Sequence, residues 1–596
     1  MDSSEQIALM QHLDKVASVF GEAAGDLLQR LLSGQRVESN SLLDSERMIA
    51  LLAQGAKVEP ASLLQQQMQF MEKQLNLWQC TIKAMMGGDL ESVIDEPRGD
   101  NRFRAPEWRE NPFFSYIKQA YLLNADFMQQ VVDGIEYEDE KTADQIKFFT
   151  RQYVNSLSPS NYILTNPEVC KEILETKGDS LAKGLDNFIK DLESSPLEGL
   201  KINQVDMDAF KVGVDLAVTP GKVIFENELM QLIQYAPATD KVYQTPLLIV
   251  PPFINKYYIL DLDRKKSWIR WLVDQGFTVF LVSWVNPDAT LAQKTFDDYV
   301  LEGVVAALDT VEQITGRPQV NAVGYCVGGT LLGVSQAYLR ARGDDRIQAL
   351  TLLTTLFDFS EPGEVGNYIS EHSLPLIKQY TENKGYFDGR LLALSFSLLR
   401  ENNLFWTYFV DNYLKGKDSV PFDILYWNGD STNIPQNAYL YYLENMYVNN
   451  RLIEPGGISV AGVPIDLGLI DTPAYSLATA ADHIVLWPAA YRSSRHLRGP
   501  VRFVLAGSGH VAGVVNPAPG GKYPHWVNEV LPETAQQWRQ DAEQREGSWW
   551  LDWLDWMAQY RGALVDAKPV GSKRFPALED APGRYVKVRL ETAAAA

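Results

Sequence analysis

The sequence predicts an α/β fold over its larger, C-terminal part and a mostly helical domain before it. After about residue 205, short apolar runs of strand type alternate with segments of helical spacing. That alternation is typical of a parallel sheet whose strands are joined by right-handed helical crossovers. Before residue 205 the segments are helix-compatible and carry little chemistry. We therefore expect a helical domain over residues 1–205 and an α/β domain over residues 206–596.

The N-terminal domain is expected to contain long helices. Residues 63–86 are rich in Gln, Met, Leu and Lys, with almost no β-branched residues, which is a strong helical composition. Residues 95–111 are polar and contain Pro97 and Pro106, so they predict an exposed loop. Helical spacing returns over residues 113–132. Packing between helices is the preferred interpretation of the apolar stripes here, ahead of contact with a partner.

Six apolar segments are expected to be strands of the sheet, because they are short and bounded by turn residues. They are residues 247–250, 278–282, 320–325, 349–353, 473–478 and 501–505. Between the second and third of them, residues 296–315 place apolar side chains on one helical face, and Gly316 and Pro318 end that helix.

The strand pattern stops for about a hundred residues in the middle of this domain. Residues 360–452 are helical in spacing and rich in aromatic side chains. An insertion of this kind between strands typically forms a cap over an active site. Near the C-terminus, four tryptophans at helical spacing predict core packing first and an interaction face second: Trp549, Trp550, Trp553 and Trp556.

Composition limits the possible functions. The chain has 54 basic and 76 acidic residues, a net charge of −22, and no basic block, which argues against nucleic acid as a partner. Three widely spaced cysteines do not form a disulfide framework and fit a reducing compartment. The start of the chain lacks the pattern of a signal peptide, and no apolar stretch approaches the roughly 20 residues that span a bilayer. We expect a cytoplasmic protein without a transmembrane segment.

The stretch that organises the chain is residues 324–329, Gly-Tyr-Cys-Val-Gly-Gly. It follows a predicted strand and precedes a helix-compatible run, which is the setting of a nucleophile elbow. Glycines there let the strand turn sharply into the helix and hold the middle side chain, Cys326, away from the backbone. Serine is usual at this position. The succession of elements around the elbow predicts an α/β-hydrolase fold.

In that fold the nucleophile, the acid and the histidine follow one another along the chain. Asp482 comes shortly after the strand at 473–478, and His510 follows the strand at 501–505 in a glycine-rich turn. Because loops at the carboxyl ends of neighbouring parallel strands converge, we expect both side chains to meet Cys326. Of the six histidines in the chain, His510 has the fitting position; His483 is expected as a support or substrate contact.

The expected chemistry is acyl transfer through a covalent thioester. His510 would take the proton of the Cys326 thiol, and Asp482 would orient the imidazole and stabilise its charge. The backbone N–H of Val327 and one from the loop after residue 250 would hold the oxyanion. In that loop Phe253, Ile254 and Asn255 have N–H groups, and we favour Ile254.

Cysteine in the elbow favours transfer to an alcohol over simple hydrolysis. If the acyl donor is a thioester, attack by Cys326 yields another thioester, so the acyl group stays activated. An incoming alcohol then accepts it with a favourable free energy. A serine ester would lose that activation in the first step. Cysteine hydrolases of the same fold exist, so hydrolysis stays open on this argument.

Six segments together resemble the class I polyhydroxyalkanoate synthases, which polymerise 3-hydroxyacyl-CoA. The segments are residues 148–153, 251–261, 324–329, 426–433, 482–485 and 508–513. The resemblance covers most of the chain after about residue 95. It implies that Cys326 is acylated and that His510 and Asp482 complete the triad. In that family the Asp is also discussed as helping to activate the incoming 3-hydroxyl, and the sequence leaves open which of His510 and Asp482 does so.

The resemblance also implies partners and further contacts. They are a short-chain 3-hydroxyacyl-CoA substrate, a second copy of the chain, the growing polyester granule, whose surface the enzyme would occupy, and phasin-type granule proteins. The N-terminal domain would serve dimerisation and granule contact. His483, Asn255 and Trp427 are predicted substrate contacts. No metal and no cofactor is expected, since CoA is a leaving group.

Two other functions remain open. A thioesterase or hydrolase of the same fold would release free acid and no polymer. A non-catalytic granule scaffold would release no CoA. We rank the synthase first, the hydrolase second and the scaffold third.

Overall fold

The computed structural model describes residues 57–590 apart from positions 59, 138, 197, 198, 372 and 519. The chain divides into two compact units. The helical unit comprises the described residues up to Gln204 together with Leu394–Val420, and the sheet unit comprises Val205–Ala393 and Pro421–Glu591. Residues 1–56 of the predicted helical domain lie outside the described residues.

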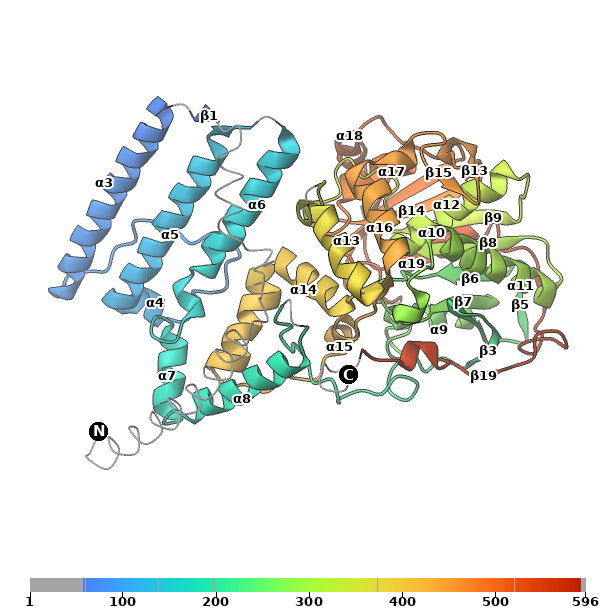
Figure 1. The fold of residues 1–596 in the computed structure, drawn as a ribbon, viewed down its shortest axis with the longest axis horizontal. Helices are drawn as coiled ribbons and strands as arrows, with labels where there is room; N and C mark the ends of the chain where they lie inside the picture. The colour runs from blue at the N-terminus through green and yellow to red at the C-terminus, as the bar shows by residue number, and fades with distance from the viewer. Residues whose placement is uncertain are drawn as a thin grey trace. The chain divides into compact units, whose positions relative to one another are not determined.

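The helical unit contains three long helices that lie side by side (Figure 1). α3 (Pro60–Met85) contacts α5 (Pro112–Asp133), which contacts α6 (Glu140–Ser156). The Asn111 side chain caps α5 by accepting from the first free backbone N–H groups, and Pro112 suits its first position. Shorter elements complete the unit: α4 (Glu107–Glu110), α7 (Pro167–Glu175), α8 (Asp179–Ser194), the π-helical η6 (Asn402–Trp406) and η7 (Phe409–Leu414), and the pair β1 (Lys57–Val58) and β2 (Ile135–Glu136).

One face of α3 is apolar and exposed. Its side chains follow the alternating four-three spacing of a coiled-coil seam, with the half-buried Ile82 in the remaining position. The members of this seam are 56–65% exposed: Leu64, Met68, Met71, Leu75, Trp78 and Met85. A different face of α3 turns inward, where Leu77 is buried and Phe70 stacks on Phe127 of α5 with ring centroids 4.6 Å apart.

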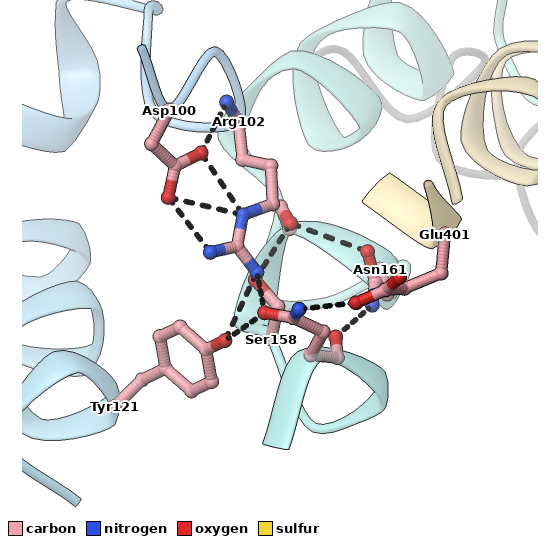
Figure 2. A network of polar contacts seen from close by, with 8 residues as sticks. Asp100, Arg102, Tyr121, Ser158, Asn161 and Glu401 are labelled. Carbon is pink, nitrogen blue, oxygen red and sulfur yellow. Dashed lines mark hydrogen bonds and ion pairs between the residues drawn. The ribbon is translucent and has the colours of Figure 1, made fainter. Parts of the chain in front are cut away.

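A buried polar network ties the segment Leu394–Val420 to the N-terminal helices (Figure 2). Arg102 pairs with Asp100 and donates to the Asn155 side chain at 3.1 Å. Asn155 in turn donates to the Glu401 carboxylate at 2.6 Å, and the Arg151 guanidinium lies 3.4 Å from the same carboxylate. Because a buried carboxylate is costly without such partners, Glu401 holds its segment on these helices.

This network changes the extent of the predicted cap. Leu394–Val420 lies within residues 360–452, yet it is grouped with the helical unit. The motif at residues 148–153 contributes directly, since Gln152 donates to the Leu398 carbonyl at 3.0 Å. Part of α14 (Gly389–Leu399) belongs to this segment. The remaining cap segments are helical, as predicted: α13 (Ser373–Lys384), α15 (Asp423–Gly429), α16 (Gln436–Tyr442) and the π-helical η8 (Leu443–Val448).

The sheet unit contains an eleven-stranded mixed sheet in the order β17-β16-β15-β14-β9-β8-β6-β7-β4-β3-β19. Its central strands are parallel and confirm the six predicted segments: β6 (Leu247–Val250), β7 (Val279–Trp284), β8 (Val320–Tyr325), β9 (Ile347–Leu353), β14 (Ala474–Thr479) and β15 (Val501–Ala506). The outer strands run antiparallel: β3 (Gly221–Glu226), β4 (Met230–Tyr235), β16 (His525–Val527), β17 (Glu543–Arg545) and β19 (Glu579–Asp580). The sequence analysis did not anticipate these antiparallel edges.

Both faces of the sheet are covered, so successive residues of a central strand enter different cores. In β6, Leu248 and Val250 pack in one core and Leu247 and Ile249 in the other. The first core lies under α10 (Phe296–Asp298), η4 (Tyr299–Val305), α11 (Ala306–Thr315), α12 (Val327–Ala341) and α17 (Trp487–Ser494), and the second under α9 (Trp268–Asp274) and α19 (Trp549–Met557) (Figure 1).

Three of the four tryptophans of α19 are core residues, as predicted, and Trp556 is partly buried against the same core. Trp549, Trp550 and Trp553 are at most 1% exposed and pack around Trp268 of α9, with ring centroids 5.5–6.5 Å apart. No helix among the residues of the described ranges is long and apolar enough to cross a membrane.

We predict that Glu401→Ala loosens the segment Leu394–Val420. The change removes the carboxylate that pairs with Arg151 and Asn155, and we expect a loss of about 2 kcal/mol in the stability of the helical unit. Thermal unfolding and limited proteolysis would measure it, with cleavage starting within residues 394–420. Glu382→Ala is the control, because Glu382 pairs with Lys378 on an exposed surface and should change stability by less than about 0.5 kcal/mol. Equal proteolysis of both variants would contradict the prediction.

Candidate active site

Cys326 occupies a sharp turn between β8 and α12. Its backbone has φ 53° and ψ −127°, a conformation that L-residues rarely adopt and that the surroundings must hold. The Cys326 N–H donates to the Leu353 carbonyl at the end of β9, at 2.8 Å. Its own carbonyl accepts from the Gly329 N–H, also at 2.8 Å. The turn is therefore anchored on the strand side and on the helix side.

The glycines of this turn have a steric reason. A Cβ at Gly324 would lie 2.4 Å from the Cα of Gly329, and one at Gly328 would lie 2.4 Å from the Val250 carbonyl oxygen. A Cβ at Gly329 would lie 1.9 Å from the hydroxyl oxygen of Thr355. These separations are far below van der Waals contact, so a side chain at any of the three positions would displace backbone or a packed neighbour.

Asp482 and His510 meet at the carboxyl ends of β14 and β15. The Nδ1 of His510 lies 2.7 Å from Oδ2 of Asp482, to which it donates. The Ala481 N–H donates to the Ser508 carbonyl at 2.8 Å and ties the two loops together. Asp482 is 6% exposed and His510 8%. The structure thus brings the predicted acid and histidine together.

The Asp482 carboxylate is fully satisfied. Its Oδ1 accepts from the backbone N–H groups of Ile484 and Val485, each at 2.9 Å, and its Oδ2 accepts from the Thr479 hydroxyl at 3.0 Å as well as from His510. Burial alone would raise the pKa of Asp482, but the His510 ring and these N–H donors outweigh burial and hold that pKa below its usual value. The carboxylate therefore stays ionised at neutral pH.

His510 is held in contact with Cys326. Burial disfavours the charged imidazole, but the Asp482 carboxylate and, through charge and a hydrogen bond, the Cys326 side chain hold the pKa of His510 well above its usual value. Since Nδ1 faces Asp482, Nε2 is the ring nitrogen left for the thiol. Tyr325 stacks on the imidazole with centroids 5.6 Å apart and donates to the His510 carbonyl at 3.2 Å. Sequence reasoning did not identify this support from Tyr325.

The loop after β6 lies against the first turn of α12. The contact is direct, since the missing side chain of Gly328 leaves room for the Val250 and Pro251 carbonyls. Val327 is the first residue of α12, where a helix provides no partner for the backbone N–H. Ile254 lies partly buried in the adjoining loop. The two predicted oxyanion donors thus belong to neighbouring backbone segments beside Cys326.

Two of the predicted substrate contacts make structural hydrogen bonds. The Asn255 side chain accepts from the Lys256 N–H at 2.8 Å, and the Trp427 indole donates to the Lys256 carbonyl at 2.6 Å. Trp427 is 6% exposed and its one polar atom is engaged, which assigns it to holding the loop. His483 is half-buried beside Asp482, and its carbonyl adjoins the turn at Gly363. Contact of any of them with substrate stays a prediction.

Two aromatic rings of the cap pack together with the loop after β6. Burial raises the pKa values of Tyr442 and Tyr447, and the charge of Cys326 contributes to both shifts. Phe253 of the loop after β6 packs on Tyr442 at 6.5 Å between centroids, and Tyr442 packs on Tyr447 at 5.6 Å. The density of aromatics in residues 360–452 was the sequence signal. It did not single out these two.

Within the described ranges, no group of three or more His, Cys, Asp or Glu side chains is placed to hold a metal ion. The arrangement of cysteine, imidazole and carboxylate is the kind that can move a proton from a thiol and create a thiolate. An arrangement of this kind suits attack on an acyl carbon, with the first turn of α12 next to the developing negative charge.

The strand order and the Cys-His-Asp chain at the strand ends define an α/β-hydrolase fold, and residues 245–517 match the family described as alpha/beta hydrolase fold. Residues 99–272 match the family described as poly-beta-hydroxybutyrate polymerase (PhaC) N-terminus. The chain is 45% identical over 542 residues to the poly(3-hydroxyalkanoate) polymerase subunit PhaC of Cupriavidus necator, covering 90% of each chain. The protein belongs to the poly(3-hydroxyalkanoate) polymerase family.

A second relative supports this assignment. The chain is 38% identical over 584 residues to the polymerase subunit PhaC of Rhizobium meliloti, covering 98% of this chain and 95% of that one. Among solved structures, a putative hydrolase from Agrobacterium vitis S4 is 14% identical, with a TM-score of 0.30, covering 49% of this chain and 91% of that one.

We predict that Asp482→Asn lowers the rate of CoA release by about 10³- to 10⁴-fold and also lowers the pKa of His510. Both effects are expected because an amide neither stabilises the imidazolium nor keeps its tautomer. The pair stabilises the fold where Asp482 is ionised and His510 is charged. That contribution is complete at about pH 6 and is lost as the pH rises through the raised pKa of His510. Thermal melts should therefore separate the variant from the wild type more at about pH 6 than at about pH 9.

The control is Asp274→Asn, which alters an exposed pair with Arg270. It should change neither CoA release nor the pH dependence of unfolding. A normal rate of CoA release in Asp482→Asn would contradict the role of this carboxylate.

Proposed function

We propose that the protein is an acyltransferase that polymerises (R)-3-hydroxyacyl-CoA into polyhydroxyalkanoate, with release of CoA, through a thioester on Cys326. The observation that carries the proposal is the buried Asp482–His510 pair beside a cysteine held at positive φ, in a chain of this family. The triad assigns a role to each polar group at the strand ends.

In the first half-reaction, Nε2 of His510 takes the thiol proton, and the Cys326 sulfur attacks the thioester carbonyl. The oxyanion forms between the N–H groups proposed for it, those of Val327 and Ile254. The carbon–sulfur bond to CoA then breaks, and CoA leaves as the thiol with the proton from His510. The Asp482 carboxylate keeps its charge throughout and balances that of the imidazolium.

In the second half-reaction, a 3-hydroxyl group attacks the Cys326 thioester, and an ester replaces it. We propose His510 as the base that takes the hydroxyl proton. Asp482 is the weaker candidate, because each of its oxygens already accepts two hydrogen bonds and its carboxylate is inaccessible to solvent. The thiol regains its proton from His510 at the end of the step.

The family resemblance favours short substrates such as 3-hydroxybutyryl-CoA. The aromatic side chains of Phe253, Tyr442 and Tyr447 near the thiol fit a compact apolar acyl group. His483 and the Nδ2 group of Asn255 are the candidates for a direct contact, since Trp427 uses its one polar atom on the loop and Asn255 uses only its Oδ1 there. The proposed location is the cytoplasm, on the surface of polyester granules.

We further propose that the protein acts as a homodimer and that its helical unit serves assembly and granule contact, with phasin-type proteins as possible neighbours. The exposed seam on α3 supports this proposal, because its four-three spacing fits a second helix. The positions beside the seam are mostly uncharged, which allows two identical helices to approach.

Two alternative functions give different products. A thioesterase of this fold would convert 3-hydroxybutyryl-CoA into free acid and CoA, with no polyester of high mass. A non-catalytic granule scaffold would release no CoA, and its Cys326 would not react selectively with a thiol probe. A panel of 3-hydroxyacyl-CoA thioesters, with CoA release and product mass measured together, separates the three.

We predict that Cys326→Ala abolishes both CoA release and polymer formation, because no group then carries the acyl chain. Mass spectrometry of the wild type after brief exposure to substrate should find the acyl group on Cys326. Cys170→Ala is the matched control, since Cys170 is a free cysteine in the helical unit and should leave the rate unchanged. Near-native CoA release by Cys326→Ala would refute the assignment.

We predict that Met71→Lys combined with Leu75→Lys weakens self-association at least about tenfold, because two charges then enter the apolar seam of α3. Sedimentation velocity over a range of concentrations measures the equilibrium, and the fraction bound to isolated granules measures the second role. Gln69→Lys combined with Asn76→Lys adds the same charge at exposed polar positions of α3 that lie away from the seam and its flanks, and should have little effect. An unchanged equilibrium in the seam variant would exclude α3 from the dimer contact.

A further inference from the structure

We infer that Lys256 is a positioning residue for the oxyanion-binding loop, which it clamps to Asp430 and to the C-terminal segment. The inference rests on the proposed function, in which the Ile254 N–H of this loop holds the oxyanion. Lys256 follows that residue by two positions and does not itself reach the reacting atoms. Its role is to fix the direction of the backbone between β6 and η2 (Tyr257–Leu260).

Two tryptophan side chains hold the two ends of the loop. The Trp284 indole donates to the Pro251 carbonyl at 2.9 Å, and the Trp427 indole donates to the Lys256 carbonyl at 2.6 Å. Ile254 lies between these two points. With both flanking carbonyls engaged, the peptide planes between them have little freedom to rotate, which is the condition for a preorganised donor.

The Lys256 side chain makes the second attachment. Its Nζ lies 2.6 Å from Oδ1 of Asp430 and donates to the Val588 carbonyl at 2.7 Å. The other oxygen of Asp430 accepts from the Tyr258 hydroxyl at 2.9 Å. Lys256 and Tyr258 lie in the same short stretch of chain, and both thus bind the carboxylate of Asp430, the residue that follows α15. Their two contacts fix the distance between that stretch and α15.

The pair is buried in a way that stability alone does not explain. The side chains of Lys256 and Asp430 are 5% and 2% exposed. Taking two charges out of water costs more than their attraction returns unless the geometry is good, and apolar residues of similar size are often as stable or more so. A buried pair does, however, fix one arrangement of the groups it joins. Here that arrangement sets the direction of the backbone in the oxyanion-binding loop.

The clamp also joins this loop to its neighbour in the sheet. The Asn286 side chain, just after β7, donates to the Val588 carbonyl at 3.4 Å and accepts from the Asn433 N–H at 3.0 Å. The loops after β6 and β7 therefore share one acceptor, Val588, on the C-terminal segment. The motifs at residues 251–261 and 426–433 meet in this cluster. Their contact gives both motifs a structural role that the triad does not explain.

The test separates two reactions of the same sulfur. Acylation of Cys326 by 3-hydroxybutyryl-CoA passes through an oxyanion, whereas its alkylation by iodoacetamide does not. In Lys256→Met, which keeps the length of the side chain without its charge, we expect the single-turnover acylation rate to fall about 10- to 100-fold, short of the loss of a whole oxyanion donor. The alkylation rate should stay within about twofold of the wild type.

Lys118→Met is the matched control. Lys118 is equally buried, 2.7 Å from Glu96 in the helical unit, and its replacement should leave both rates unchanged. If Lys256→Met does not fold, Asp430→Asn replaces it, because the amide keeps the shape of the carboxylate; the same split is expected, with acylation down about tenfold.

Two outcomes would overturn the inference. One is a normal acylation rate in the folded variant, and the other is a parallel loss of acylation and alkylation, which would indicate general disruption of the site. Failure of the proposed function looks different, because the wild-type Cys326 would then not be acylated by the thioester at all.

Discussion

The strained turn at Cys326 is the constraint on which the rest of the sheet unit depends. A residue at φ 53° costs on the order of 1–3 kcal/mol and persists only if its surroundings leave no alternative. The Leu353 carbonyl and the Gly329 N–H hold the turn at both sides, and the close approach of Gly328 to the loop after β6 leaves no room for relaxation. The same approach brings that loop to the first turn of α12, so one steric arrangement positions both the proposed nucleophile and its proposed oxyanion donors.

The electrostatics of the site follow from how completely Asp482 is satisfied. With four donors on its two oxygens, the carboxylate has no capacity left to exchange a proton with a substrate. Its effect is exerted through His510, whose pKa it raises against the effect of burial. A histidine that readily holds a proton is suited to stand beside a thiolate and then to return that proton to a leaving thiol. In the proposed mechanism this division of roles would apply to both half-reactions.

Much of the sheet and of the candidate site was predictable because both follow from local sequence patterns. Apolar runs mark the six parallel strands, and the chain order of Cys326, Asp482 and His510 follows the order of those strands. The antiparallel edges were missed because they break the alternation of strand and helix, and β19 is only two residues long. The placement of Leu394–Val420 rests on Glu401 and its partner Asn155, 246 positions away, and the Lys256–Asp430 pair spans 174 positions. Such pairings leave no periodic signal in the sequence.

The choice of sulfur becomes clearer when the cap is considered with the triad. A thioester on Cys326 is useful for polymerisation only if an alcohol reaches it before water does. The rings of Phe253, Tyr442 and Tyr447 interlock near the thiol, and Phe359 packs on Tyr447 at 5.0 Å. Apolar walls of this kind exclude water and strengthen each charge interaction within them. In the proposed mechanism the elbow would keep the acyl group activated and the aromatic cap would protect it, so that the two features together would favour chain growth over hydrolysis.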